Sequence, residues 1–114
     1  MTPTVEDHFA GKDPELKAAY DRLMTVLRGF GTVREAPKQT SIHLVKNAGF
    51  AGVHPRKTSF NLEFRTDYRI DDARVVREQQ LSARRFEHTV KIERAADIDE
   101  RLAAWLKDAY TLAK

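Results

Sequence analysis

The chain has 114 residues, of which 41% are apolar and 32% charged, and this composition is typical of one soluble globular domain. It contains no cysteine, which excludes disulfides, thiolate nucleophiles and cysteine-ligated zinc or iron–sulfur clusters. The net charge of +3 is uneven: residues 38–94 carry twelve Lys/Arg against seven Asp/Glu, whereas residues 1–37 and 95–114 each have a balance of −1. Such asymmetry indicates either an anionic partner or a solvated sheet rich in arginine.

The chain shows no sign of a membrane or export segment. Its first residues, "MTPTVEDHF", lack the basic and apolar regions of a signal peptide. No apolar stretch approaches the roughly 18 residues that a membrane-spanning helix needs. We therefore expect a cytoplasmic protein.

A short helix is predicted over residues 4–10. Thr4 is a suitable N-cap, and Asp7 occupies the third position of a capping box. Gly11 ends this helix after barely two turns.

A longer helix is predicted over residues 14–30. Asp13 is a good N-cap, Pro14 suits the first helical position, and Gly31 suits the position after the last turn. Apolar residues recur at spacings of three and four, which places them on one helical face: Leu16, Tyr20, Leu23, Leu27 and Phe30.

Strands are predicted between residues 32 and 94, where the apolar period changes to two. In "TSFNLEF", Phe60, Leu62 and Phe64 alternate with polar residues. "SIHLVK" and "RRFEHTVKIER" alternate in the same way, and the latter places His88 on the apolar face of its strand. No helical pattern separates these segments, so we expect an antiparallel sheet of five or six strands.

A last helix is predicted over residues 98–112, with Asp97 as N-cap and Glu100 in the capping box. Each helix has one apolar stripe and most strands have one apolar face. The sequence therefore predicts a single domain over residues 1–114 with an α+β fold. We expect a two-layer sandwich in which the N-terminal and C-terminal helices pack on one face of the sheet.

The opposite face of the sheet is predicted to be open, flat and of mixed charge. Its side chains would be Ser41, His43, Asn61, Glu63, Arg65, Glu87, Thr89 and Lys91. Such a face offers a surface for a protein partner or a second copy of the chain.

Local motifs give no support for catalysis. The four histidines form neither an HxH nor an HExxH pattern, and the chain lacks GxGxxG, GxxxxGK[ST] and GxSxG. We therefore expect no catalytic residue, no metal and no cofactor.

An anion-binding rim is the leading hypothesis. Arginine and lysine bind carboxylates and phosphates, and neighbouring hydroxyls complete such a cradle. Residues of these types lie near predicted strand ends, and ends that are distant in sequence meet at one rim of a meander. We predict a site with cations, hydroxyls and an inward histidine as its wall: Lys38, Thr40, Ser41, Arg56, Lys57, Arg85 and His88. The ligand would be an anionic small molecule or an acidic peptide.

Three alternatives stay open. The burial expected for His88 is also that of a hydrogen-bonded core histidine, and cations at strand ends also keep sheet edges soluble. A basic sheet also suits weak nucleic-acid binding, for which Phe50 and Tyr68 are the available loop aromatics. A third alternative is a module for protein interaction or homodimerisation.

Several segments resemble a small bacterial family. They are "APKQTSIHLV", "FAGVHPRKTSFNLEF" and "LSARRFEHTVKIERAADIDERLAAWLKDAY", preceded by "TVEDHFAGKDPELKAAYDRL". The chain resembles the domain-of-unknown-function family numbered five-six-five-five, which is also seen at the C-terminus of predicted transport proteins. The resemblance implies no established activity, and its motifs include the predicted rim residues and His88. The helix–sheet–helix order is also distantly similar to frataxin-like YdhG-type domains.

Overall fold

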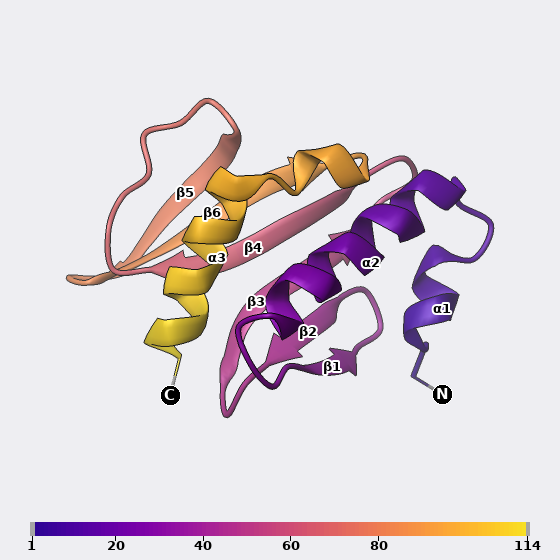
Figure 1. The fold of residues 1–114 in the computed structure, drawn as a ribbon, viewed down its shortest axis with the longest axis horizontal. Coiled ribbons are helices and arrows are strands. Elements are labelled where there is room, and N and C mark those ends of the chain that lie inside the picture. Colours follow the sequence, from indigo (N-terminus) through magenta and orange to yellow (C-terminus); the bar gives the residue numbers. More distant parts are fainter. Residues whose placement is uncertain (1, 114) are drawn as a thin grey trace.

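The computed structural model describes residues 2–113, and its elements follow the predicted order (Figure 1). The helices are α1 (Val5–Phe9), α2 (Pro14–Arg28) and α3 (Glu100–Leu112), with a 3-10 turn at Ala95–Asp97 before α3. The strands are β1 (Arg34–Pro37), β2 (Ile42–Val45), β3 (Gly49–Pro55), β4 (Phe60–Thr66), β5 (Val75–Ser82) and β6 (Arg85–Ile92). None of the helices in this range combines the length and apolar character that crossing a bilayer requires.

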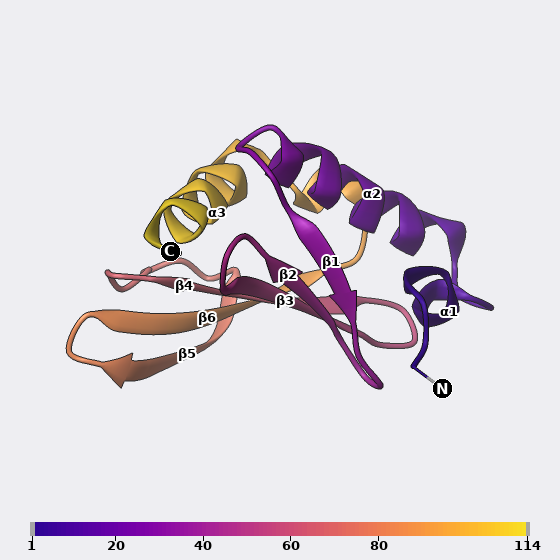
Figure 2. The ribbon, with the colours of Figure 1, turned by 90° about the horizontal axis from the view of Figure 1, so that it is seen from below.

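The six strands form one antiparallel sheet in the order β1-β2-β3-β4-β6-β5. Strands β1 to β4 form a meander, whereas β6 inserts between β4 and β5. α2 and α3 lie together on one side of the sheet, and no helix of the described chain covers the other side (Figure 2). The predicted two-layer α+β sandwich is therefore confirmed.

The core lies between the two helices and the alternating strands. Phe60 and Leu62 of β4 are fully buried, as the alternation predicted. The ring of Phe60 meets those of Phe9 and Tyr20 edge to face, each at 6.4 Å between centroids. Burying a large apolar side chain contributes roughly 1.5–3 kcal/mol, so the helical stripes supply much of the stability. The buried stripe residues are Leu16, Ala19, Tyr20, Leu23, Met24 and Leu27 of α2, and Leu102, Leu106 and Ala109 of α3.

The N-terminal caps of α1 and α2 form as predicted. Thr4 Oγ1 accepts a hydrogen bond from the N–H of Asp7, and Asp7 Oδ2 accepts one from the N–H of Thr4. α2 ends at Arg28, two residues earlier than predicted, with Gly29 as its C-cap. The Gly29 N–H donates to the carbonyls three and four residues earlier, so the last turn is already tightened.

The start of α3 also differs from the prediction. Asp99, not Asp97, is the N-cap, and its Oδ1 accepts a hydrogen bond from the N–H of Leu102 at 3.0 Å. The Asp97 carboxylate instead accepts the N–H groups of Glu93 and Arg94 at the end of β6. Asp97 thus caps the turn that precedes the helix.

β5 is an edge strand without regular alternation. Its register with β6 shifts on either side of Val76 and again around Leu81. These are the two large apolar side chains that the described chain exposes, at 62% and 45%. Bulges twist an edge strand and hinder its pairing with other chains, so β5 is an edge protected against aggregation.

Candidate functional site

Two hairpin turns bring most of the predicted cations to one end of the sheet. Residues 38–41 join β1 to β2, and residues 56–59 join β3 to β4; we call these segments the basic turns. They lie at the same end because β2 and β3 are adjacent and antiparallel, with Ile42 opposite Val53. The turns are closed by backbone hydrogen bonds of 2.7 Å each, from Lys38 to Ser41 and from Arg56 to Ser59.

The cations of the basic turns, Lys38, Arg56 and Lys57, are exposed and make no ion pair in the described part of the chain. Thr40 is exposed beside them, whereas Ser41 is buried. The structure therefore brings five of the predicted residues to one end, with Ser41 behind the surface that the other four present.

Arg85 lies at the opposite end of the sheet, so the prediction of a single rim is wrong. β4 and β6 are antiparallel, and Phe60 pairs with Ile92 at one end while Thr66 pairs with Phe86 at the other. The basic turns adjoin the first pair and Arg85 adjoins the second. Six residues of strand separate the two ends, which is roughly 20 Å. The guanidinium of Arg85 instead donates to the carbonyl of Arg84 at 2.8 Å.

His88 is a core histidine, so its prediction as a pocket wall is also wrong. It has no exposed surface, and its ring lies 5.4 Å from that of Phe64. The Thr66 hydroxyl donates to the carbonyl of Tyr68, so His88 Nε2, 2.8 Å from Thr66 Oγ1, is the donor to that oxygen. His88 Nδ1 lies 3.1 Å from Glu78 Oε2 without hydrogen-bond geometry. Burial lowers the pKa of His88, and the Glu78 carboxylate opposes this effect.

A segment of residues 67–74, which we call the strap, connects β4 to β5 and is held mainly by carboxylates. Glu78 accepts hydrogen bonds from the N–H of Ile70 and from Arg69, each at 3.0 Å. Asp72 pairs with Arg101 at 2.9 Å, nearer to α3. These bonds keep the pKa values of Glu78 and Asp72 below their usual range, chiefly through backbone N–H donors.

The strap is therefore expected to loosen in acid. A carboxylate whose pKa is depressed on folding stabilises the fold above its unfolded pKa, and this contribution is lost as pH falls through the folded pKa. We expect the melting temperature of the wild type to fall more between about pH 6 and pH 3 than that of Glu78→Gln, which lacks the titrating group. Calorimetry at both pH values measures the difference. Equal falls would show that Glu78 does not carry this pH dependence.

A hollow of about 400 Å³ lies on the open face, which we predicted to be flat. Across β2, β3 and β4, His43, Gly52 and Glu63 form one row of paired residues, and Gly52 leaves the middle of that row without a side chain. We call this depression the open-face hollow. Its polar lining comes from four strands: His43, His54, Glu63, Arg65 and Glu87.

The polar lining of the open-face hollow contains two neighbouring contacts between a basic side chain and a carboxylate. His54 Nε2 lies 2.6 Å from Glu63 Oε1, and Arg65 Nε lies 3.3 Å from Glu87 Oε2. Burial raises the pKa of Glu63, His54 opposes this, and the nearby Glu87 carboxyl adds to the rise. Our sequence-based site omitted these residues. Gly52 within the predicted strand segment "GFAGV" was the signal for a hollow there, because a glycine inside a strand leaves space above the sheet.

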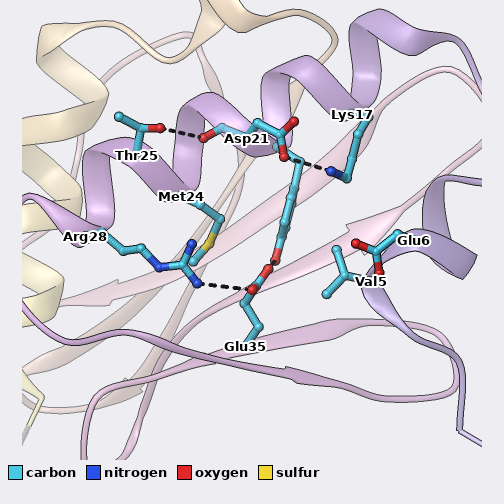
Figure 3. Close-up of a pocket in the computed structure, with 9 residues that line it drawn as sticks. Val5, Glu6, Lys17, Asp21, Met24, Thr25, Arg28 and Glu35 are labelled. Carbon is cyan, nitrogen blue, oxygen red and sulfur yellow. Dashed lines mark hydrogen bonds and ion pairs between the residues drawn. The ribbon is translucent and has the colours of Figure 1, made fainter.

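A second hollow of about 420 Å³ lies between α1, α2 and β1 (Figure 3). Both oxygens of Glu35 are already occupied there: the Tyr20 hydroxyl donates to one at 2.6 Å and Arg28 donates to the other at 3.1 Å. Burial of the Tyr20 hydroxyl and its hydrogen bond to Glu35 raise the pKa of Tyr20. Lys17 and Asp21 form an ion pair with each other at 2.8 Å, one helical turn apart on α2. We assign these contacts a structural role, in which they attach α2 to the edge strand β1.

The fold defines a small α+β domain with a basic end and a polar hollow. No group of three His, Asp or Glu side chains in the described range could hold a metal ion. The family model for a domain of unknown function, DUF5655, matches residues 5–113, so the chain belongs to this family. No curated protein and no solved structure matches the chain. The occurrence of this family at the C-terminus of predicted transport proteins stays a prediction. The distant similarity of the chain to frataxin-like domains also stays a prediction.

Proposed function

We propose that the chain is a non-catalytic, cytoplasmic bacterial binding module that holds an anionic small molecule or an acidic peptide at its basic turns. The observation that carries this proposal is the convergence of Lys38, Arg56 and Lys57, which lack ion-pair partners within the described chain. Three uncompensated cations in two adjacent hairpins attract an anion, and the fork of Arg56 suits a carboxylate or a phosphate. The exposed Thr40 hydroxyl adds a donor.

Anchoring of the β1–β2 turn supports the same proposal. The buried side chain of His8 in α1 lies 2.8 Å, through its Nε2, from the carbonyl oxygen of Lys38. Two contacts therefore hold the β1–β2 turn: the backbone hydrogen bond from Lys38 to Ser41, and the contact of His8 with the carbonyl of Lys38. A held backbone lowers the conformational entropy that is lost when the turn orders around a ligand.

The proposed site is tested by comparing two variants that each lose two consecutive cations at one end of the sheet. Arg56→Ala/Lys57→Ala removes charge from the basic turns, and Arg84→Ala/Arg85→Ala removes the same charge from the other end. We expect phosphate, citrate or a triglutamate peptide to raise the melting temperature of the wild type and of the second variant only. A ligand at a hundred times its dissociation constant stabilises the folded state by about 2.7 kcal/mol.

The outcomes are distinct. If no anion stabilises the wild type, or if both variants respond as the wild type does, the anion site is not at the basic turns. Loss of the response in both variants would show a nonspecific effect of net charge.

Nucleic acid is the alternative anionic partner, and the same variants address it. Its binding would weaken steeply with salt because bound cations release counterions. The strand aromatics Phe60, Phe64 and Phe86 are buried, and Phe50 is buried as well, so they provide no stacking platform for bases.

A homodimer through the open face would double the 13.1 kDa mass that light scattering measures.

A further inference from the structure

The open-face hollow is built by the sequence of β3. Gly52 lies between two polar positions of neighbouring strands, His43 and Glu63, and its missing side chain exposes the sheet surface. Its backbone needs no glycine: a Cβ there would meet His54 Nε2 at an ordinary 3.7 Å, and Gly52 is not among the glycines with positive φ. The glycine is therefore explained by the space that it leaves, not by strain in the strand.

The charge balance of the open-face hollow favours a cationic guest. Glu63 and Glu87 contribute two carboxylates, and Arg65 is the one permanently charged cation among the lining residues. The lining itself therefore carries one more negative than positive permanent charge, and Arg77 of β5, beyond Thr89 in the same cross-strand row, partly offsets it from outside the lining. The basic turns have the opposite excess.

The two carboxylates also have unused hydrogen-bonding capacity. His54 contacts Oε1 of Glu63, and Arg65 contacts Oε2 of Glu87. Within residues 2–113, the other oxygen of each carboxylate accepts no hydrogen bond from a donor group. Glu63 and Glu87 are diagonal neighbours on β4 and β6, and the Glu87 carboxyl raises the pKa of Glu63. Two carboxyl groups at such a position repel unless a proton or a cation lies between them.

We propose that the open-face hollow binds a small organic cation whose protonated amine lies between Glu63 and Glu87. The amine would donate to the two free carboxylate oxygens, which are acceptors of complementary charge. The carbon chain of the guest would lie along the bare backbone of Gly52, in the middle of the cross-strand row of His43, Gly52 and Glu63. A volume of about 400 Å³ lies within the usual range for small-molecule sites.

A metal ion is a poorer guest for this hollow. No three ligand-type side chains are grouped closely enough for one anywhere in the part of the chain that the structure describes. An ammonium group requires only directed acceptors, and two carboxylates from adjacent strands supply them. A free polyamine and a lysine side chain both carry a protonated amine on an alkyl chain. Both sources of the amine are therefore tested separately.

The proposal is tested by titration calorimetry with putrescine, spermidine and Nα-acetyl-lysine amide as separate probes. We expect saturable binding to the wild type and at least about tenfold weaker binding to Glu63→Gln and to Glu87→Gln, because each loses a charge-assisted hydrogen bond. Gly52→Val fills the floor of the hollow with a residue that strands favour, and we expect it to abolish binding while the fold persists. Binding by the lysine amide alone would identify a lysine side chain as the natural guest.

Matched controls separate this site from net-charge effects and from the basic turns. Glu93→Gln removes an exposed carboxylate outside the hollow, and Arg56→Ala/Lys57→Ala removes the proposed anion site. Both variants are expected to bind the amines as the wild type does. The proposal is overturned if no amine binds, if Glu93→Gln weakens binding as much as Glu87→Gln, or if Mg²⁺ binds at the hollow in place of the amines.

Discussion

Replacing Phe60 with alanine is expected to lower the free energy of unfolding by about 3–5 kcal/mol, the usual cost of truncating a buried aromatic residue. Phe60 has no exposed surface, and it joins the sheet to the helical layer through the rings of Phe9 and Tyr20. The alanine variant leaves a cavity between the two layers. Urea denaturation followed by far-UV circular dichroism measures the loss.

The matched control for Phe60→Ala is Val76→Ala. Val76 lies in a bulge of the edge strand and is 62% exposed, so its truncation should change stability by less than about 0.5 kcal/mol. Comparable losses in the two variants would contradict the position of the core between the sheet and the helices.

Replacing Gly31 with alanine is expected to destabilise the protein by about 1–3 kcal/mol. The φ angle of Gly31 is +152°, a conformation that residues with a Cβ rarely adopt. An added Cβ would also collide with the Tyr110 hydroxyl, which donates to the carbonyl of Thr32 at 3.0 Å. The alanine variant must therefore displace the Tyr110 ring, and with it the hydrogen bond to Thr32, as well as strain its own backbone. Thermal unfolding monitored by calorimetry measures the change.

Gly49→Ala is the control for Gly31→Ala. A Cβ on Gly49 would meet nothing within 4 Å, and its φ is not positive. Alanine there should be neutral or stabilise the fold by about 0.4–1 kcal/mol, because it restricts the unfolded chain. If Gly31→Ala were equally benign, the contact between Gly31 and Tyr110 would not constrain the α2–β1 connection.

The fold could be predicted from the sequence because its elements follow local rules. Each of these local patterns can be recognised within about 15 residues of chain: the helical period of 3.6 residues, the strand period of two, and N-caps such as Asp13. The helix ends were less predictable, since Asp97 and Asp99 are both chemically competent N-caps. Only the backbone path after β6 decides which carboxylate each N–H group meets.

The candidate site could be predicted only in part, because sheet order is not a local property. The basic turns converge since β2 and β3 form a simple hairpin. The prediction for Arg85 was wrong because β6 pairs antiparallel with β4. This pairing places the start of β6, and Arg85 with it, beside the end of β4. The open-face hollow needs the cross-strand row through His43, Gly52 and Glu63, and no single strand contains that information.

The insertion of β6 beside β4 makes the β4–β6 pairing the least local strand pairing of the sheet. The nearest residues that this pairing joins, Thr66 and Phe86, are 20 positions apart, and the farthest, Phe60 and Ile92, are 32 apart. Closing such a loop costs more entropy than forming the β1–β4 meander, whose neighbours are joined by short turns. In any partly folded chain in which β6 has not yet paired with it, β4 is an exposed sheet edge, and the β4–β6 pairing closes the longest loop of the sheet.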